Sequence, residues 1–357
     1  MQSETLPYTM KAMQIERYGK HCPVQENTVP LPVLGRTDVL VEIRAASVNP
    51  IDLKIRNGGL KSLLKYTMPL TLGSDFAGVV VAVGRGVRRF KVGDEVYGCA
   101  ERARIGSFAE YIAANEKTLA FKPRNLNFAE AASIPLVGLT VWQIFRDIGL
   151  RPNQKVLIHA GAGGIGSFAV QLANHIGAYT AATASGDSRY LVHSLGADRV
   201  IDYKTEPFQT LLSNYDAVLD TIGGDTLKHS FLVLKPGGTV VSIASMPTAA
   251  AAAQWGAGLA KQGLFSLCSL PMRLRARRLH THYTFHFVQP HGADLQRITD
   301  LIEAERIRPV IDHVFPFAET QNALEYAALG RTKGKVVVAV KEGADEGGMA
   351  ALEEYAA

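Results

Sequence analysis

The stretch Gly161-Ala162-Gly163-Gly164-Ile165-Gly166 decides the fold of this chain. It fits the pattern G-x-G-x-x-G; residues 155–159 (KVLIH) before it predict a short buried strand, and residues 167–173 (SFAVQLA) after it predict a helix. Glycines here let the backbone turn tightly and approach a phosphate, and the helix N-terminus supplies free N–H groups and the positive end of its dipole. The combination predicts a pyrophosphate site for a dinucleotide. The alternative is a tight turn that only packs a helix onto a sheet.

The sequence around this turn alternates between strands and helices. We expect strands at 156–159, 179–184, 199–201, 217–220, 239–242 and 284–288, and helices at 139–148, 165–176, 189–195 and 293–304. Such alternation predicts βαβ units and a doubly wound parallel sheet. Residues 249–263 are rich in alanine and glycine and match no element clearly.

The first 133 residues have a different texture. Strands are expected at 39–45, 78–84, 94–98 and 108–113, separated by turn-like segments, which predicts a small, irregular, barrel-like domain. Asn127, followed three residues later by Glu130, predicts a capped helix start. Strands at 312–317 and 335–340 flank a helix at 319–329, and the last strand lacks a βαβ partner, so we expect it to rejoin the first domain. The predicted division is a first domain of residues 1–133 completed by 312–345, a second of residues 134–311, and a loosely held tail of residues 346–357.

The composition is that of a globular protein with two domains. The chain has 357 residues, of which 47% are hydrophobic and 20% charged. No run of 18 apolar residues occurs, so neither a membrane span nor a membrane partner is predicted. Three scattered cysteines and the polar N-terminus favour the reducing cytoplasm. The net charge of +5 is mild. The basic run at 273–278 lacks interleaved aromatics, so a solvated helix face or loop is favoured over a nucleic-acid site.

The residues after the second expected strand bear on the choice of nucleotide. An acid at the end of that strand would accept a hydrogen bond from a ribose 2′-hydroxyl, whereas Ser185 stands there, with Arg189 one helical turn further. This favours NADPH, although Asp187 could still turn toward the ribose. Tyr203 has the right type to lie over the adenosine ribose, or it is a surface aromatic.

Metal ligands are sparse in the sequence. No C-x-x-C pair occurs, and the ten histidines include no convincing ligand pair. We therefore predict no metal site.

Several motifs match one known family in order along nearly the whole chain. They are residues 45–52 (AASVNPID), 72–80 (LGSDFAGVV), 92–98 (VGDEVYG), 138–140 (GLT), the glycine turn and 334–338 (GKVVV). With these motifs the chain resembles the medium-chain dehydrogenase/reductase superfamily. Its zinc alcohol dehydrogenases carry Cys near Asn49 and Gly-His-Glu near Gly73, where this chain has Asn49-Pro50 and Gly73-Ser74-Asp75. The chain therefore resembles the zinc-free quinone oxidoreductase branch, which includes alkenal/enone reductases and reticulon-4-interacting-protein-like enzymes.

The resemblance implies an α/β fold: a GroES-like irregular β-barrel catalytic domain and a Rossmann domain with a doubly wound parallel sheet. It implies that Asn49 lines the active site and that Asp52 supports it. Some relatives have a tyrosine proton donor where residues 57–60 (NGGL) stand here, so Tyr66, Lys54 and a water stay open as the proton donor. The implied cofactor residues are Thr140, Phe287 and Val288 at the nicotinamide, Ala162, Gly163, Gly164 and Ile165 at the pyrophosphate, Ser185, Arg189 and Tyr203 at the 2′-phosphate, Thr221 at the adenosine, and the closing loop Arg331, Thr332 and Lys333.

The function expected from residues and resemblance together is an NADPH-dependent, zinc-independent reductase. It would transfer a hydride to a quinone or to the activated C=C bond of an α,β-unsaturated carbonyl, acceptors that are already electrophilic and need no Lewis acid. The alternatives are a trans-acting enoyl reductase and a non-enzymatic NADPH-binding or RNA-associated scaffold. The resemblance also implies a homodimer formed through the edge of the nucleotide-domain sheet.

Overall fold

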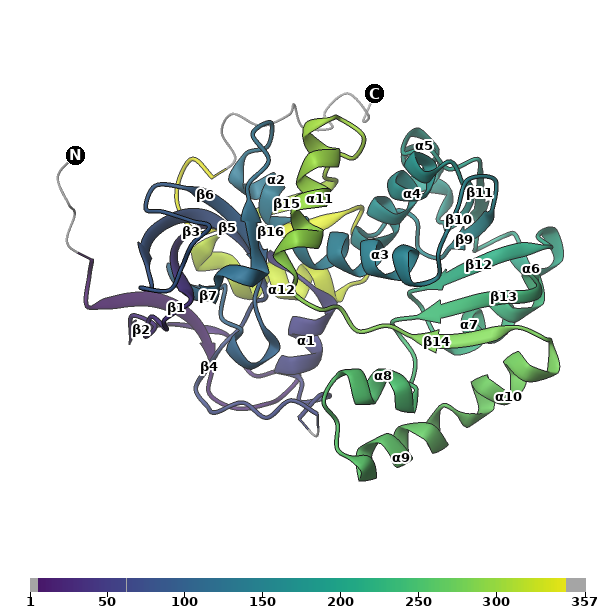
Figure 1. Ribbon diagram of the computed structural model, residues 1–357, viewed down its shortest axis with the longest axis horizontal. Coiled ribbons are helices and arrows are strands. Elements are labelled where there is room, and N and C mark those ends of the chain that lie inside the picture. The colour runs from purple at the N-terminus through teal and green to yellow at the C-terminus, as the bar shows by residue number, and fades with distance from the viewer. Residues whose placement is uncertain (1–5, 62, 345–357) are drawn as a thin grey trace. The chain divides into compact units, whose positions relative to one another are not determined.

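The computed structural model describes residues 6–61 and 63–344, and these form two compact units (Figure 1). The first unit holds described residues up to Leu139 and from Gln289 onward, and the second is Thr140–Val288. The helix α3 (Pro135–Asp147) crosses the division. The expected tail at 346–357 lies outside the described residues.

Unit 1 is built on two sheets. A three-stranded sheet has the order β2-β1-β4, and a seven-stranded sheet runs β15-β16-β3-β5-β6-β8, with β7 paired to β3. Val41, Ile43, Phe76 and Val96 belong to the buried core of this unit. The strands are β1 (Thr9–Ile15), β2 (Gln25–Pro30), β3 (Asp38–Val48), β4 (Leu70–Thr71), β5 (Asp75–Val83), β6 (Glu95–Cys99), β7 (Tyr111–Asn115), β8 (Leu119–Phe121), β15 (Ile311–Pro316) and β16 (Lys335–Ala339). The helices are α1 (Pro50–Arg56), α2 (Phe128–Ala132), α11 (Gly292–Glu303) and α12 (Thr320–Ala328), with short 3₁₀ turns η1 (Arg102–Arg104), η2 (Glu116–Thr118) and η5 (Phe317–Glu319).

Two local predictions in unit 1 are confirmed. Asn127 and Glu130 form a capping box, in which the Glu130 N–H donates to Asn127 Oδ1 at 2.8 Å and the Asn127 N–H donates to Glu130 Oε2 at 2.9 Å. The last strand, β16, pairs with β3 and so returns to the first domain.

Unit 2 is a six-stranded, all-parallel sheet of order β11-β10-β9-β12-β13-β14. The chain starts at β9 and winds outward in both directions, which is the doubly wound order with a switch point between β9 and β12. The strands are β9 (Lys155–Ile158), β10 (Tyr179–Ala184), β11 (Arg199–Asp202), β12 (Tyr215–Asp220), β13 (Leu234–Ser242) and β14 (His282–Phe285). The helices are α4 (Gly164–Ile176), α5 (Arg189–Ser194), α6 (Phe208–Leu211), α7 (Gly224–Ser230), α8 (Ala249–Gln254), α9 (Leu259–Cys268) and α10 (Leu270–Arg278), with 3₁₀ turns η3 (Gly186–Ser188) and η4 (Phe231–Val233).

The structure differs from the sequence-based expectations at several element bounds and at the division into units, which gives unit 2 as Thr140–Val288, and two differences bear on the predicted site and domains. The sixth strand was expected at 284–288 but lies at 282–285, so Phe287 and Val288 follow it. Helix α11, expected in the second domain, packs instead on β8 of unit 1, and Tyr97 of the neighbouring strand β6 donates its hydroxyl to the Leu295 carbonyl at 3.1 Å. Alternation of helix and strand continues through α11, and the sequence does not reveal which sheet the helix covers.

No helix among the described residues is both long and apolar enough to cross a bilayer. The three cysteines are all free, with Cys22 and Cys99 buried and Cys268 exposed.

Candidate functional site

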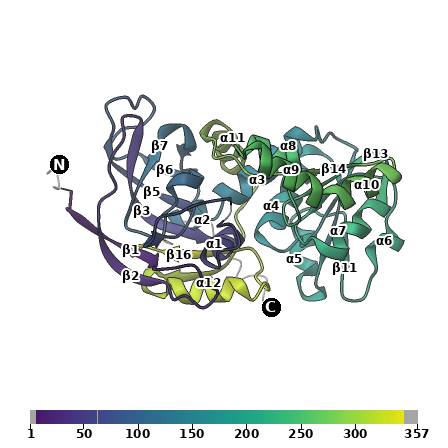
Figure 2. The ribbon, with the colours of Figure 1, turned by 90° about the horizontal axis from the view of Figure 1, so that it is seen from below.

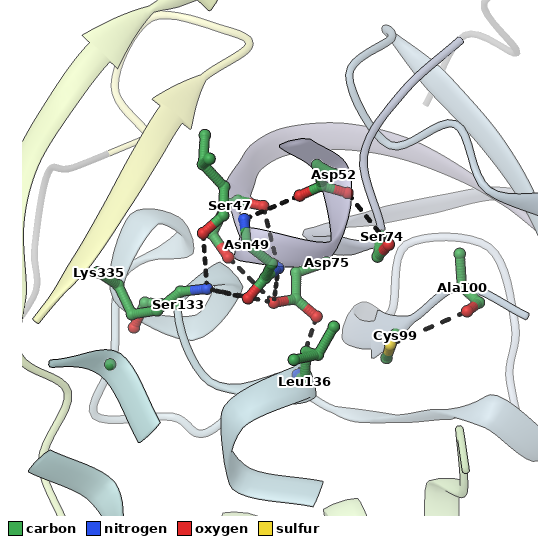
Figure 3. Close-up of polar contacts among 12 residues, drawn as sticks. Ser47, Asn49, Asp52, Ser74, Asp75, Cys99, Ala100, Ser133, Leu136 and Lys335 are labelled. Carbon is green, nitrogen blue, oxygen red and sulfur yellow. Dashed lines mark hydrogen bonds and ion pairs between the residues drawn. The ribbon is translucent and has the colours of Figure 1, made fainter. Parts of the chain in front are cut away.

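A buried polar network surrounds the start of α1 in unit 1 (Figure 3). Asn49 is the N-cap of α1, and Pro50 takes the first helical position, where its missing N–H costs nothing. The backbone N–H of Asn49 donates to Oδ2 of Asp52 at 2.8 Å, and its side-chain Nδ2 donates to Oδ2 of Asp75 at 2.9 Å. Asn49 and Asp52 are 1% and 0% exposed. The structure thus brings these two predicted residues into one network.

Asp75, the first residue of β5, is the acceptor at the centre of the network. Its Oδ2 also accepts from Ser47 Oγ at 3.0 Å, and its Oδ1 accepts from the Leu136 N–H at 2.9 Å. Antiparallel pairing of β3 with β5 places Ser47 opposite Asp75, so the sheet register itself builds the contact. The Ser74 hydroxyl donates to Asp52 Oδ1 at 3.4 Å and joins the second carboxyl group to the network.

Lys335 supplies the only ammonium group in this network as the structure describes it. Its Nζ donates to the Val48 carbonyl at 2.9 Å and to Asn49 Oδ1, and it lies 3.6 Å from Asp75 Oδ2. The Lys335 side chain is 6% exposed. Because Val336 pairs with Val48 across β16 and β3, Lys335 arrives beside the start of α1. Both ends of the Asn49 amide are therefore engaged, its oxygen by Lys335 and its nitrogen by Asp75.

Burial shifts the titration of every ionisable group in this cluster. It raises the pKa of Asp52 to about 7 and raises the pKa of Asp75, while it lowers the pKa of Lys335. The attraction between Asp75 and Lys335 works against both burial effects. Burial and the two carboxyl groups raise the pKa of the Cys99 thiol well above its ordinary value, so this cysteine is no activated nucleophile.

Sequence reasoning identified Asn49 and Asp52 but assigned no part to Ser47, Asp75 or Lys335. Asp75 and Lys335 stand inside two quoted motifs, LGSD and GKVVV, and this was the available signal. A lysine that begins a strand is ordinarily solvent-exposed, because its charge is costly to bury without a partner. Only the pairing of β16 with β3 shows that Lys335 is buried.

The two side chains weighed as proton donors lie differently. Lys54 is exposed on α1 and has no part in the network. Tyr66 is half-buried and donates its hydroxyl to the Arg102 carbonyl at 2.7 Å. Burial, with the Asp52 carboxylate adding to it, raises the pKa of Tyr66 to about 12. The Tyr66 hydroxyl therefore stays protonated at neutral pH, and its proton is donated to a backbone carbonyl.

The glycine turn in unit 2 has the geometry of a phosphate cradle. It connects β9 to α4, and Gly163 is the N-cap. A Cβ at Gly166 would lie 2.1 Å from the Ala160 carbonyl oxygen, and one at Gly161 would lie 2.8 Å from Ala182 Cβ, so these two glycines are needed for packing. A Cβ at Gly163 would meet nothing closer than 3.4 Å. The first N–H groups of a 13-residue helix thus follow an uncrowded glycine backbone, which fits a pyrophosphate.

His159, two residues before this turn, is a buried residue whose two ring nitrogens both have hydrogen-bond partners. Its Nδ1 is 3.1 Å from Thr183 Oγ1 and its Nε2 is 2.9 Å from Ser230 Oγ. Burial lowers its pKa to about 3, so the ring is neutral and adds no charge behind the cradle.

The predicted adenosine residues gather at the carboxyl ends of β10 and β11. Ser185 follows β10, its Oγ 3.2 Å from Ser188 Oγ, and the Tyr203 N–H donates to the Ala184 carbonyl at 3.2 Å. Tyr203 is 60% exposed. Arg189 forms an ion pair with Glu206 at 2.8 Å, a partner that sequence reasoning missed.

The remaining predicted cofactor residues of unit 2 occupy three places. Thr221 follows β12 and donates its hydroxyl to the His159 carbonyl at 3.0 Å, next to the glycine turn. Phe287 stacks on Trp255 with ring centroids 3.4 Å apart and 11° between the ring planes, and Val288 is half-buried beside it in the chain. Thr140 is buried in α3. Ala162, Gly164 and Ile165 form the turn itself and the first helical residues.

The loop 331–333 belongs to unit 1. The Lys333 N–H donates to Asp312 Oδ1 at 2.8 Å, which ties the loop to β15. Arg331 and Lys333 are exposed and Thr332 is half-buried.

No group of three or more His, Cys, Asp or Glu side chains within residues 6–61 and 63–344 is arranged to hold a metal ion. At the positions that the resemblance assigns to zinc ligands, the Lys335 ammonium contacts Asn49 and lies 3.6 Å from Asp75.

Comparison with known proteins agrees with this architecture. Residues 35–124 match the alcohol dehydrogenase GroES-like domain, and residues 195–338 match the family described as zinc-binding dehydrogenase. The chain is 33% identical to the mitochondrial NAD(P)H oxidoreductase RTN4IP1 of Danio rerio, over 93% of this chain and 92% of that protein. It is 35% identical to a 2-methylene-furan-3-one reductase of Solanum lycopersicum, over 94% and 80% respectively. The solved quinone oxidoreductase of Coxiella burnetii superposes with a TM-score of 0.82 at 31% identity, covering 93% of this chain and 100% of that one.

The fold and the glycine turn define a medium-chain dehydrogenase/reductase, and the chain belongs to this family. Within the family it belongs to the branch of quinone and alkenal/enone oxidoreductases, and it is a nicotinamide-dependent oxidoreductase.

Proposed function

We propose that this protein uses NADPH to reduce quinones or the activated C=C bond of α,β-unsaturated carbonyl compounds. The cradle at residues 161–166, followed by a serine where NAD-selective folds carry an acid, is the observation that carries the proposal. The reductases and quinone oxidoreductases among the relatives support the class of acceptor. When bound, NADPH supplies the hydride.

The residues of unit 2 have the chemistry to hold the cofactor. The backbone N–H groups at the start of α4 would bind the pyrophosphate, and Ser185, Arg189 and Tyr203 would surround the 2′-phosphate. The ion pair between Arg189 and Glu206 is half exposed, so the guanidinium has solvent access and a second partner can share it. Thr221 beside the glycine turn, Thr140, Phe287 and Val288, together with the loop 331–333, complete the proposed set.

We propose Asn49 and Asp52 as positioning residues of the active site. Their polar atoms are occupied by Lys335, Asp75, Ser74 and each other, so they fix the turn into α1 and have little capacity left for a substrate. The proton that completes the reduction is proposed to come from water, because Lys54 is exposed and the Tyr66 proton is committed to Arg102.

We propose that the reaction is independent of zinc. The Lys335 ammonium touches Asn49 and lies 3.6 Å from Asp75, so a second cation at this place would meet a like charge in a buried setting. Activated acceptors need no Lewis acid, and orientation and hydrogen bonding are sufficient.

The test is NADPH oxidation by the purified protein, followed at 340 nm with quinones, enones, a carrier-bound enoyl thioester and saturated aldehydes. We expect turnover with quinones or enones, unchanged after dialysis against a chelator. Turnover only with the enoyl thioester would replace the proposed acceptor, and no oxidation of NADPH or NADH with any acceptor would refute the proposal.

Two variants test the assigned residues. Ser185→Asp places a carboxylate at the 2′-phosphate and should lower kcat/KM for NADPH by about 10- to 100-fold, the worth of one charge-assisted hydrogen bond, with little change for NADH. Ser185→Ala is the matched control. A wild type that already prefers NADH overturns the assignment. Tyr66→Phe should keep kcat within about threefold, whereas a loss on the order of 100-fold would make Tyr66 the proton donor.

We also propose a homodimer formed through β14, the last strand in the order of the unit 2 sheet, and the cytoplasm as its compartment. Analytical ultracentrifugation of the wild type and of a proline variant at Tyr283 in β14 tests the dimer, because proline removes a backbone donor from a strand edge. Fractionation of the native cells tests the compartment.

A further inference from the structure

Helices α9 and α10 present leucines to the solvent. Leu264, Leu267 and Leu274 are 57%, 69% and 45% exposed. With Leu270, which is 39% exposed, they follow one another at spacings of three and four residues, so they share one side of the helical run. We name these four residues the leucine face. An ordinary surface helix turns such a stripe toward the core, yet α9 has no buried residue and Ala276 is the one buried residue of α10.

The longer segment that contains these two helices holds the whole positive excess of the chain. Residues 226–293 contain no Asp or Glu and seven Lys or Arg residues, out of 38 basic and 33 acidic residues in the protein. The rest of the chain therefore carries 31 basic and 33 acidic residues and is close to neutral. Arg277 and Arg278 are exposed on α10. None of the four arginines of α10 has an ion pair with a carboxylate within the described part of the chain.

A basic hollow lies beside the leucine face. It has a volume of about 460 Å³ and is lined by Arg273, Arg277, His280 and His282 together with Ala276, Thr281 and Tyr283, at the junction of α10 and β14. In Figures 1 and 2, α9 and α10 follow each other as one run beside β14. The leucines and the arginines of the lining thus belong to the same helical run.

Three kinds of partner can be weighed against this surface. Nucleic acid would take the arginines but would leave four leucines exposed, and α10 itself has no aromatic residue among its arginines for stacking on bases. A second copy related by two-fold symmetry would cover leucines with leucines, but it would also bring together two sets of arginines that form no ion pair with a described carboxylate. A bilayer with anionic headgroups fits both the arginines and the leucines. Its phosphates pair with the arginines, and the leucines insert at the boundary between the headgroups and the acyl chains.

We propose that α9 and α10 dock this protein on the surface of a bilayer containing anionic phospholipids. The leucine face enters the headgroup boundary, and the exposed Arg277 and Arg278 of α10 bind lipid phosphates. The docking is peripheral and reversible. It goes beyond the reductase activity, and no residue of the proposed cofactor site takes part in it.

The test is flotation of the full-length protein with vesicles of phosphatidylcholine alone or mixed with phosphatidylglycerol. We expect binding to the anionic vesicles at about 0.1 M salt, weaker binding at about 1 M salt, where the screening length falls to roughly 3 Å, and little binding to neutral vesicles. Arg277→Gln with Arg278→Gln should weaken binding by about fivefold per arginine. Leu264→Ser with Leu267→Ser should weaken it by tenfold or more, because each leucine loses apolar burial.

Matched controls come from unit 1. Val33→Ser removes an apolar side chain that is 89% exposed, and Arg85→Gln removes an exposed arginine, and both should leave vesicle binding unchanged. NADPH oxidation with a water-soluble quinone, or in its absence the thermal unfolding midpoint, shows that every variant is folded. The docking result thereby stays separate from the proposed activity.

Several outcomes would overturn the proposal. If the protein does not float with anionic vesicles, or if the leucine variant floats as well as the wild type, the proposed membrane docking is refuted. Conversion of a dimer into a monomer by the leucine variant, with vesicle binding unchanged, would assign the face to a second copy. Release from vesicles by RNA, with binding sensitive to the arginine variant alone, would assign the surface to nucleic acid.

Discussion

Replacement of Lys335 by methionine tests the buried network most directly. Methionine keeps the length and much of the apolar stem of lysine but removes the ammonium that contacts Val48, Asn49 and Asp75. Asp75 is 0% exposed and would be left without a cation. Its hydrogen bonds from Ser47 and Leu136 remain. The variant therefore isolates the charge of Lys335 from the rest of the site.

Removal of one partner of a buried ion pair costs about 3–5 kcal/mol, because the other charge stays buried without compensation. At roughly 2–4 °C per kcal/mol for a unit of this size, the thermal midpoint should fall by about 10 °C. The deficit should depend on pH. Without Lys335 the pKa of Asp75 rises further above its unfolded value, so stability is retained in acid and is lost as pH rises. We expect a smaller deficit at about pH 5 than at about pH 8.

Thermal and urea unfolding of four proteins measure this coupling: the wild type, Lys335→Met, Asp75→Asn and the double variant. The double variant should recover most of the loss, to within about 1–2 kcal/mol of the wild type, since neither charge is then stranded. A single Lys335→Met variant as stable as the wild type, or a double variant no better than the single one, would refute the assignment of Lys335 as the cation that compensates Asp75.

Two further predictions concern the glycine turn of unit 2. Gly166→Ala places a Cβ 2.1 Å from a backbone oxygen, so it should lower NADPH affinity and also lower the free energy of unfolding by about 1–3 kcal/mol. Gly163→Ala places a Cβ that meets nothing closer than 3.4 Å, so this variant should keep the thermal midpoint of the wild type. It should still bind NADPH more weakly in a titration of cofactor fluorescence. Equal stability losses in the two variants would contradict the packing argument. The pKa of His159 falls to about 3 in the folded protein, so below the ordinary histidine pKa the unfolded state binds a proton that the folded state does not. The free energy of unfolding of the wild type, measured in urea titrations, should therefore fall by about 2 kcal/mol between about pH 7 and pH 5. His159→Gln should flatten that slope, and an unchanged slope would place the acid sensitivity elsewhere.

The parts of the fold that rest on local signals could be predicted from the sequence. Strand β10 begins and ends at the predicted residues 179 and 184, and Asn127 caps its helix because Glu130 lies only three residues further along the chain. The end of β14 was misplaced because residues 282–288 (HYTFHFV) stay apolar and aromatic beyond the last ladder pair. Phe287 lies beyond the end of β14 and stacks on Trp255, which is more than thirty residues away in the sequence. A local sequence pattern does not predict such a contact.

The candidate site divides in the same way. Asn49 and Asp52 were found because the family resemblance assigns them to the active site, and the glycine turn was found because its residues are consecutive. Lys335 was missed because its environment is assembled by strands distant in sequence: β16 against β3, and β3 against β5. Burial of a charge is decided by register across a sheet, and a single sequence does not display that register.

The net charge of the whole chain does not show that its excess basic residues are concentrated around α9 and α10. A net charge of +5 over the whole protein is mild and gave no reason to expect a nucleic-acid partner. The buried ammonium of Lys335 must be compensated within the fold, because an unpaired charge is costly there, and Asp75 meets that need. The exposed arginines of α10 carry no such requirement, so folding explains neither the lack of acids in residues 226–293 nor the outward leucines. The sequence excluded a membrane partner because no apolar run could span a bilayer, yet docking on a surface needs only a short amphipathic helix. A feature that folding leaves unexplained is where an external partner is the better physical account.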